Sequence, residues 1–210
     1  INAMCHIENE LIDEAIGRVL SYIGTRGWGQ DTDVLYTADH GEFQGDFGMM
    51  FKGPYHVDAL MRLPMVWRPA PAVGIAPSVV EQPVGHVDLA RTFCAIAGVD
   101  PDPRMQGAVM PTSEDGTRER VITEWDGGYN GHTIHLRTLY RDGYVLTACE
   151  KSTVHDGTEG ELYNLREDPR QWVNLWNDPK YAGIKSDLIA DLYDNLPEAR
   201  QQPLEQVALV

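Results

Sequence analysis

Asp39 and His40 form the residue pair in this sequence whose types best suit chemistry at a metal ion. They follow the short apolar run 34–36 and precede Gly41, a pattern typical of a buried strand that ends in a loop. In open α/β sheets, the loops at the carboxyl ends of strands line the ligand crevice. An adjacent carboxylate and imidazole there can both reach one cation. A lone Asp-His pair is more often structural, so the surrounding sequence decides between these interpretations.

Lys52 is the first cationic side chain after this pair, thirteen positions beyond Asp39. A glycine-rich stretch, Gly45–Gly48, lies between them. A divalent cation at Asp39 and His40, together with the Lys52 ammonium, would concentrate positive charge in one place. Such a place suits a small anion.

The composition limits which partners the protein can have. The chain has 210 residues, a formal net charge of -15 and 42% apolar residues. Nothing in it forms a basic stripe, which argues against nucleic acid or anionic membrane as a partner. No apolar run approaches the roughly 18 residues of a membrane-spanning helix, so we expect a globular protein without a membrane span.

The stretch around Asp39 resembles the sulfatase family of the alkaline phosphatase superfamily, which includes the arylsulfatases. Its landmarks here are Asp39-His40-Gly41, Gly45 to Gly48, Lys52-Gly53-Pro54 and Arg62-Leu63-Pro64. The spacing from Asp-His-Gly to the lysine is the more specific signal, because phosphoglycerate mutases and nucleotide phosphodiesterases of the same superfamily share Thr-Ala-Asp-His-Gly. Phe47 departs from the pattern, since many relatives have histidine there.

This resemblance implies roles for four residues. Asp39 and His40 would help to hold a divalent cation, usually Ca²⁺ in this family, with Mn²⁺, Mg²⁺ and Zn²⁺ as alternatives. Lys52 would bind the sulfate group and stabilise or protonate the departing oxygen, as both a substrate-binding and a catalytic residue. His56 is a second catalytic candidate. It could instead be a hydrogen-bonded loop histidine, contact substrate at the rim of the site, or bind a second metal.

The family nucleophile is absent from this sequence. Sulfatases use a formylglycine made from Cys or Ser in a C/S-x-P-x-R motif, and no cysteine or serine here begins one. The resemblance places the formylglycine nearer the N-terminus, so we expect this chain to be the C-terminal half of a longer enzyme whose N-terminal half is its partner. Cys5, Cys94 and Cys149 follow no zinc or redox spacing and are expected to be ordinary packed thiols.

The expected function is therefore hydrolysis of sulfate monoesters by the complete enzyme, with this chain inactive alone. One alternative is a phosphonate or phosphate ester hydrolase of the same superfamily. Another is a non-catalytic fragment or remnant. A free chain would expose apolar surface and unpaired strands, which predicts a sticky or dimeric species.

Several elements must position these residues in the first part of the chain. Residues 5–22 carry an apolar stripe at helical spacing, which predicts a helix covering a sheet face. Residues 64–68 read as a buried strand, and Arg62 is expected to make a structural ion pair. A helix is predicted near residue 88, with Asp88 as its cap and Gly98 as its end. For His86 and Asp88, capping and packing are favoured over catalysis.

The second part of the chain has a different pattern. Residues 111–119 are rich in polar residues and predict a linker, and residues 121–125, 133–140 and 144–149 predict an antiparallel meander. Glycine-rich turns are predicted at residues 126–128 and 141–143, and the glycines around Tyr129 suggest a mobile loop that reaches the active site. Residues 179–196 predict a helix. The fold class is α/β. Residues 1–112 would form the C-terminal portion of an alkaline-phosphatase-like sheet-and-helix sandwich, and residues 113–210 a small antiparallel α+β subdomain.

Overall fold

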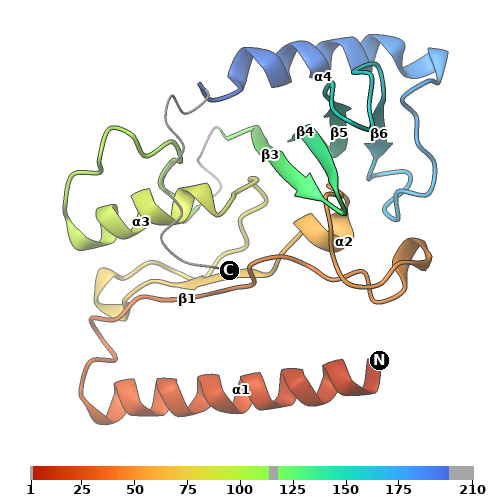
Figure 1. Cartoon of the computed structure of the whole chain (residues 1–210). Coiled ribbons are helices and arrows are strands. Elements are labelled where there is room, and N and C mark those ends of the chain that lie inside the picture. Colours follow the sequence, from red (N-terminus) through yellow and green to blue (C-terminus); the bar gives the residue numbers. More distant parts are fainter. Residues whose placement is uncertain (1, 114–117, 199–210) are drawn as a thin grey trace.

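The computed structural model describes residues 2–113 and 118–198 (Figure 1). In the N-terminal part, α1 (Asn2–Thr25) is followed by β1 (Val34–Thr37), a 3-10 turn (Asp46–Gly48), α2 (Asp58–Met61), β2 (Met65–Arg68), a second 3-10 turn (Pro71–Val73) and α3 (Val87–Ala97). The predicted first helix, both strands and the later helix are confirmed, but the prediction that the two strands are buried is wrong, because none of their residues is buried. The mixed α/β class is confirmed as well.

Strands β1 and β2 form a two-stranded antiparallel sheet in which Val34 pairs with Arg68 and Thr37 with Met65. This pairing fixes the end of β1, where Asp39 and His40 follow. Short strands of this kind need packing partners to be stable. Val66 of β2 is nevertheless 60% exposed, so much of this small sheet lies open to solvent.

Helix α1 lies apart from the other elements, along one side of the molecule (Figure 1). The prediction that it covers a sheet face is wrong for the part of the chain that the structure describes. Its apolar stripe faces solvent, with Ile7 51%, Leu11 60% and Val19 59% exposed. The physical reason is size, because two strands of four residues offer little surface to a 24-residue helix.

The C-terminal part contains a four-stranded antiparallel sheet in the order β3 (Arg120–Tyr129), β4 (His132–Arg141), β5 (Tyr144–Cys149) and β6 (Gly160–Asn164). The predicted meander is confirmed, with β6 as a further strand. The turn predicted at residues 126–128 is wrong, because these residues pair with β4 inside the strand. The turn falls at Asn130 and Gly131, whose positive φ angles of 51° and 82° suit a two-residue hairpin.

The main core lies between one face of this sheet and α4 (Ala182–Asn195), which follows a 3-10 turn (Pro179–Tyr181). Its fully buried members are Leu139, Leu146, Leu162, Leu188 and Leu192. Arg141 of β4 also pairs with Asp187 and Asp191 of α4. Because α4 occupies this face, the opposite face of the sheet is free to contact the N-terminal part.

Asp88 does not cap α3 as predicted, since it lies inside the helix and the N-cap residue is His86. The fully buried Asp88 carboxylate accepts hydrogen bonds from the amides of Gly85 and Ala108, both at 2.8 Å, and pairs with Arg118. Asp88 therefore ties three segments together, which is a packing role. Gly98 ends the helix as predicted, in a left-handed conformation. Residues 114–117 of the predicted linker and the tail after residue 198 lie outside the described residues.

Candidate functional site

Asp39 and His40 lie just beyond the carboxyl end of β1, as predicted. The Asp39 side chain is 87% exposed, and its Oδ2 lies 3.5 Å from Nε2 of His40. Its Oδ1 accepts a hydrogen bond from the backbone amide of His40 at 3.0 Å. That bond lowers the pKa of Asp39. The carboxylate is thus ionised at neutral pH and open to a cation.

The ring of His40 is oriented by its own loop. Its Nδ1 lies 2.8 Å from the carbonyl oxygen of Gly41, which can only accept a hydrogen bond. Nδ1 therefore carries the hydrogen, and the lone pair of the neutral ring sits on Nε2. Metal-binding histidines are commonly held in this way, with one nitrogen donating to a backbone carbonyl and the other free to bind.

Lys52 completes the group. Its ammonium nitrogen lies 2.6 Å from Nε2 of His40 and donates to that lone pair. The structure thus brings together the three residues that the sequence singled out as metal and sulfate ligands. A cation bound at Nε2 of His40 would displace the ammonium from it, and Lys52 could then bind an anion beside the cation.

Gly41 allows the loop to run against α2. A Cβ atom at this position would lie 1.9 Å from the carbonyl oxygen of Ala59, where no side chain fits. The Gly41 amide donates to the carbonyl oxygen of Leu60 at 2.8 Å. Leu60 packs in a small buried cluster with Phe43 and Val57. The Asp39–His40 loop therefore rests on α2 and on this cluster.

The loop from residue 44 to residue 51 has an unusual backbone. Three of its non-glycine residues have positive φ angles, namely Gln44 (49°), Phe47 (55°) and Phe51 (66°). Such angles are costly for bulky side chains and occur preferentially at functional sites. The loop closes through the Gly45 amide, which donates to the carbonyl oxygen of Met49. Lys52 directly follows this strained segment.

His56 lies away from solvent, with 4% of its surface exposed. Its Nδ1 is 2.7 Å from the hydroxyl of Thr138, which in turn lies 2.9 Å from the hydroxyl of Thr147. Burial lowers the pKa of His56 to about 4, so the ring is neutral at physiological pH. The structure places His56 against the C-terminal sheet, and its catalytic role stays a prediction.

The sequence of this region matches a known family. The family model named Sulfatase matches residues 9–99, which include Asp39, His40, Lys52 and both strands of the small sheet. Over this segment the chain is similar to the sulfatase family. Its site group therefore lies inside the segment by which the family is recognised.

Two sulfatase relatives extend this match over most of the chain. It is 28% identical to the uncharacterized sulfatase YidJ of Escherichia coli, over 91% of this chain and 37% of that protein. It is 27% identical to an N-acetylglucosamine-6-O-sulfatase of Bacteroides thetaiotaomicron, over 85% of this chain and 32% of that protein. The chain thus spans about a third of the length of these relatives.

The fold agrees with this assignment. The phosphonate monoester hydrolase of Agrobacterium radiobacter superposes with a TM-score of 0.76, over 87% of this chain and 38% of that one. The sequence identity is 24%, so this likeness concerns the fold alone. It agrees with a part of an alkaline-phosphatase-like fold. Among the residues that the structure describes, no helix is long and apolar enough to cross a membrane.

The donors of this residue group fit part of a metal site. The carboxylate of Asp39 and Nε2 of His40 supply one hard oxygen donor and one nitrogen donor within reach of each other. Within residues 2–113 and 118–198, no three His, Cys, Asp or Glu side chains gather closely enough to hold a metal by themselves. Asp39 and His40 are therefore suited to contribute two ligands to a larger set.

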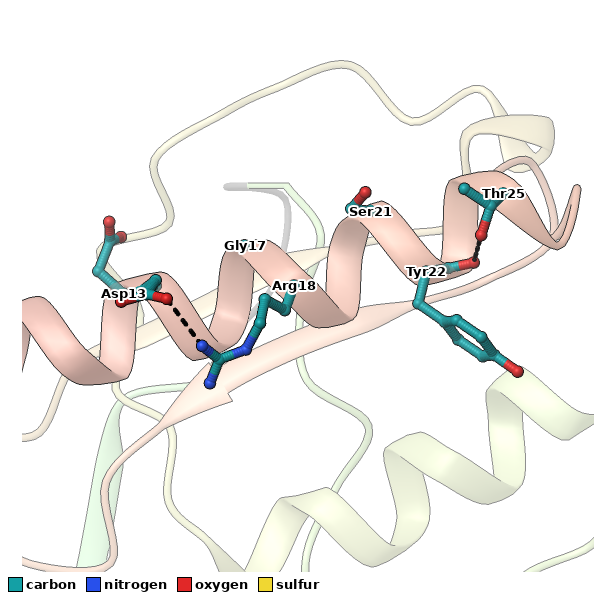
Figure 2. A pocket seen from close by; sticks show the side chains of 7 residues that line it. Asp13, Gly17, Arg18, Ser21, Tyr22 and Thr25 are labelled. Atoms are coloured by element: carbon teal, nitrogen blue, oxygen red, sulfur yellow. Dashed lines mark hydrogen bonds and ion pairs between the residues drawn. The ribbon is translucent and has the colours of Figure 1, made fainter.

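A hollow on the surface of α1 is separate from the site formed by Asp39, His40 and Lys52. It is lined by residues of this one helix, including Asp13, Gly17, Ser21 and Thr25 (Figure 2). Two of its charged residues are paired, since Arg18 donates to Glu14 at 2.8 Å. None of the residues from Asp39 to Lys52 lines it, so we do not assign it a role in the site.

Sequence reasoning missed the contact of Gln171 with this region, in which its side-chain oxygen accepts a hydrogen bond from the Asp58 amide at 2.6 Å. The prediction that the glycine-rich segment around Tyr129 reaches the site agrees with the hydrogen bond from Tyr129 to the backbone of Lys52. That segment is the end of a hairpin rather than a loop. The predicted ion pair of Arg62 is confirmed, with Asp58 at 3.5 Å.

Proposed function

We propose that this chain is the C-terminal part of a sulfatase that hydrolyses sulfate monoesters. The observation that carries the proposal is the contact of the Lys52 ammonium with Nε2 of His40, beside the exposed Asp39 carboxylate. This group lies within the part of the sequence that matches the family. The proposal extends to this chain the activity named for relatives such as the N-acetylglucosamine-6-O-sulfatase.

In this proposal, Asp39 and His40 supply two ligands of a divalent cation, Ca²⁺ by family resemblance, with Mn²⁺, Mg²⁺ or Zn²⁺ as alternatives. The cation would lower the pKa of the nucleophile and offset negative charge on the ester oxygens. Lys52 binds the sulfate group and stabilises the departing oxygen, a contribution of about 2–4 kcal/mol for a single electrostatic donor. A formylglycine nucleophile would come from a C/S-x-P-x-R motif N-terminal to the present sequence.

The exposed apolar stripe of α1 supports the proposal that a further part of the same enzyme is the partner of this chain. An N-terminal half of the same enzyme would cover Ile7, Leu11 and Val19, which are more than half exposed here. Burying such side chains stabilises an interface by about 25 cal/mol per Å² of apolar surface. This proposal predicts that the two halves form one continuous hydrophobic core, rather than two domains joined by a linker.

A phosphonate or phosphate ester hydrolase is a second candidate, because a tetrahedral anion of similar geometry fits the same three side chains. Relative turnover of an aryl sulfate and an aryl phosphonate ester by the complete enzyme separates the two. Faster turnover of the sulfate supports the proposal, and faster turnover of the phosphonate replaces it with the alternative.

The first experiment is to compare the intact mass of the purified protein with its reading frame. A longer frame with an upstream C/S-x-P-x-R motif supports the sulfatase proposal. In the complete enzyme, a chelator should then abolish aryl sulfate hydrolysis, and added divalent cation should restore it. A frame limited to these 210 residues would favour a non-catalytic remnant and contradict the proposed activity.

A further inference from the structure

The end of the β3–β4 hairpin reaches the backbone at Lys52. The hydroxyl of Tyr129 donates to the carbonyl oxygen of Lys52 at 3.4 Å. A Cβ atom on the next residue, Gly53, would lie 3.0 Å from that hydroxyl and 2.9 Å from the ring of Tyr55. The backbone that follows Lys52 is therefore enclosed by two tyrosine rings, and Gly53 leaves room for both.

The hairpin gives Tyr129 firm support. Tyr129 is the last residue of β3, pairs with His132, and precedes the tight turn at Asn130 and Gly131. Pairing with β4 continues without a break from Tyr129 back to Arg120. The far end of the sheet is packed against α4 through the main core. Figure 1 shows the free end of this hairpin close to the segment that carries α2.

Two further contacts join the same short segment to the C-terminal elements. His56 lies 2.7 Å from Thr138 of β4, and the Asp58 amide lies 2.6 Å from the side-chain oxygen of Gln171. Residues 52–58 are thus held at three points by residues distant in sequence. The loop before Lys52 is strained and largely held by its own hydrogen bonds. Contacts from the C-terminal part of the chain therefore hold Lys52 in position, in addition to the hydrogen bonds within its own loop.

We propose that Tyr129 is a positioning residue for Lys52. By packing on Gly53 and bonding to the Lys52 carbonyl, it fixes the peptide from which the ammonium reaches His40. Its effect on catalysis rests on the proposed sulfatase function, whereas the contact itself does not. Misplacing a reacting group by about 1 Å can lower a rate about 100-fold. Tyr129 therefore acts on the rate constant through Lys52, without touching substrate.

The kinetic test uses the complete enzyme. Tyr129→Ala should lower kcat about 10- to 100-fold, with KM for an aryl sulfate changed less than about threefold. Tyr129→Phe keeps the ring on Gly53 and should stay within about threefold of wild type, because the lost hydrogen bond is long. Trp172→Ala removes an aromatic side chain that is 71% exposed in the same part of the chain, and is the matched control. A Tyr129→Ala enzyme with wild-type kcat would overturn the proposal.

A double-mutant cycle tests the contact without any enzymatic assay. Gly53→Ala places a methyl group against Tyr129, whereas Tyr129→Ala provides room for it. The urea midpoints of wild type, both single variants and the double variant should therefore be non-additive, with the double variant more stable than the sum predicts. Additive effects of the two substitutions on the urea midpoint would contradict a contact between Tyr129 and Gly53. An enzyme without ester hydrolysis but with a non-additive cycle would contradict only the proposed function.

Discussion

The ammonium of Lys52 lies 2.6 Å from Nε2 of His40, while Nδ1 of the same ring faces the carbonyl oxygen of Gly41 at 2.8 Å. Nε2 has one lone pair, so it can bind either the ammonium or a cation, and not both. The residue that would bind the ester anion thus touches the residue that would bind the metal. This contact couples the two proposed roles, because a cation at Nε2 would displace the ammonium.

Replacing Lys52 should remove the anion-binding charge without unfolding the protein. We expect Lys52→Ala to lower kcat/KM for an aryl sulfate by about 100- to 1,000-fold in the complete enzyme. Lys180→Ala, which removes an exposed lysine of the C-terminal part, should change it by less than twofold, about the limit for a distant surface site. Wild-type kinetics in the Lys52 variant would exclude this lysine from the chemistry.

Gly41→Ala should destabilise the protein, because its methyl group would meet the carbonyl oxygen of Ala59 at 1.9 Å. Overpacking against backbone, which cannot rotate away, should cost about 3 kcal/mol of unfolding free energy in urea denaturation. Gly183→Ala is the matched control, since nothing lies within 4 Å of the added atom in α4. Equal stability of the two variants would contradict the close approach at Gly41.

His56 should make the stability of the protein depend on pH. Its pKa is about 4 when folded and 6.5 when unfolded, so the unfolded state binds more protons between these values. The contribution of His56 to the free energy of unfolding is therefore fully present above about pH 6.5. It falls by up to about 3 kcal/mol as the pH drops towards 4. His56→Asn retains a polar side chain that does not titrate.

The measurement for His56 is the urea midpoint of both proteins between pH 7.5 and pH 4.5. Carboxyl groups contribute equally to both, so the difference between the two curves isolates the histidine. The variant should be less stable at pH 7.5, because it loses the packing and hydrogen bond to Thr138. The difference in urea midpoint between the variant and the wild type should become smaller as the pH falls. Parallel curves would show that His56 is not held neutral by burial.

The chain by itself should self-associate. Its α1 exposes Ile7, Leu11 and Val19 on one side. Burying an exposed apolar surface of this kind against another apolar surface favours association. We expect light scattering to report dimers or larger species at micromolar concentration, and Leu11→Glu with Val19→Glu to shift them towards monomer. Gly17→Ala in the same helix, with nothing near the added atom, should leave association unchanged. A monodisperse wild-type monomer would contradict this prediction.

Local sequence determined the secondary structure and the site group. The apolar run before Asp39 predicts β1, the glycine-rich loop and the spacing to Lys52 predict which side chains meet, and Gly98 predicts the end of α3. These features depend on neighbours within a few residues, or on a loop whose length fixes its reach. Sequence patterns report such short-range constraints directly.

Tertiary structure decided what these elements contact. Tyr129 and Lys52 are 77 residues apart, and His56 and Thr138 are 82 apart, so only the path of the whole chain brings them together. The same holds for Asp88, whose partners Gly85, Ala108 and Arg118 come from three segments. The apolar stripe of α1 likewise predicted a helix correctly, but not whether a surface would cover it. The spacing of apolar residues predicts that one face of a helix is apolar. Which surface covers that face depends on how distant parts of the chain pack together.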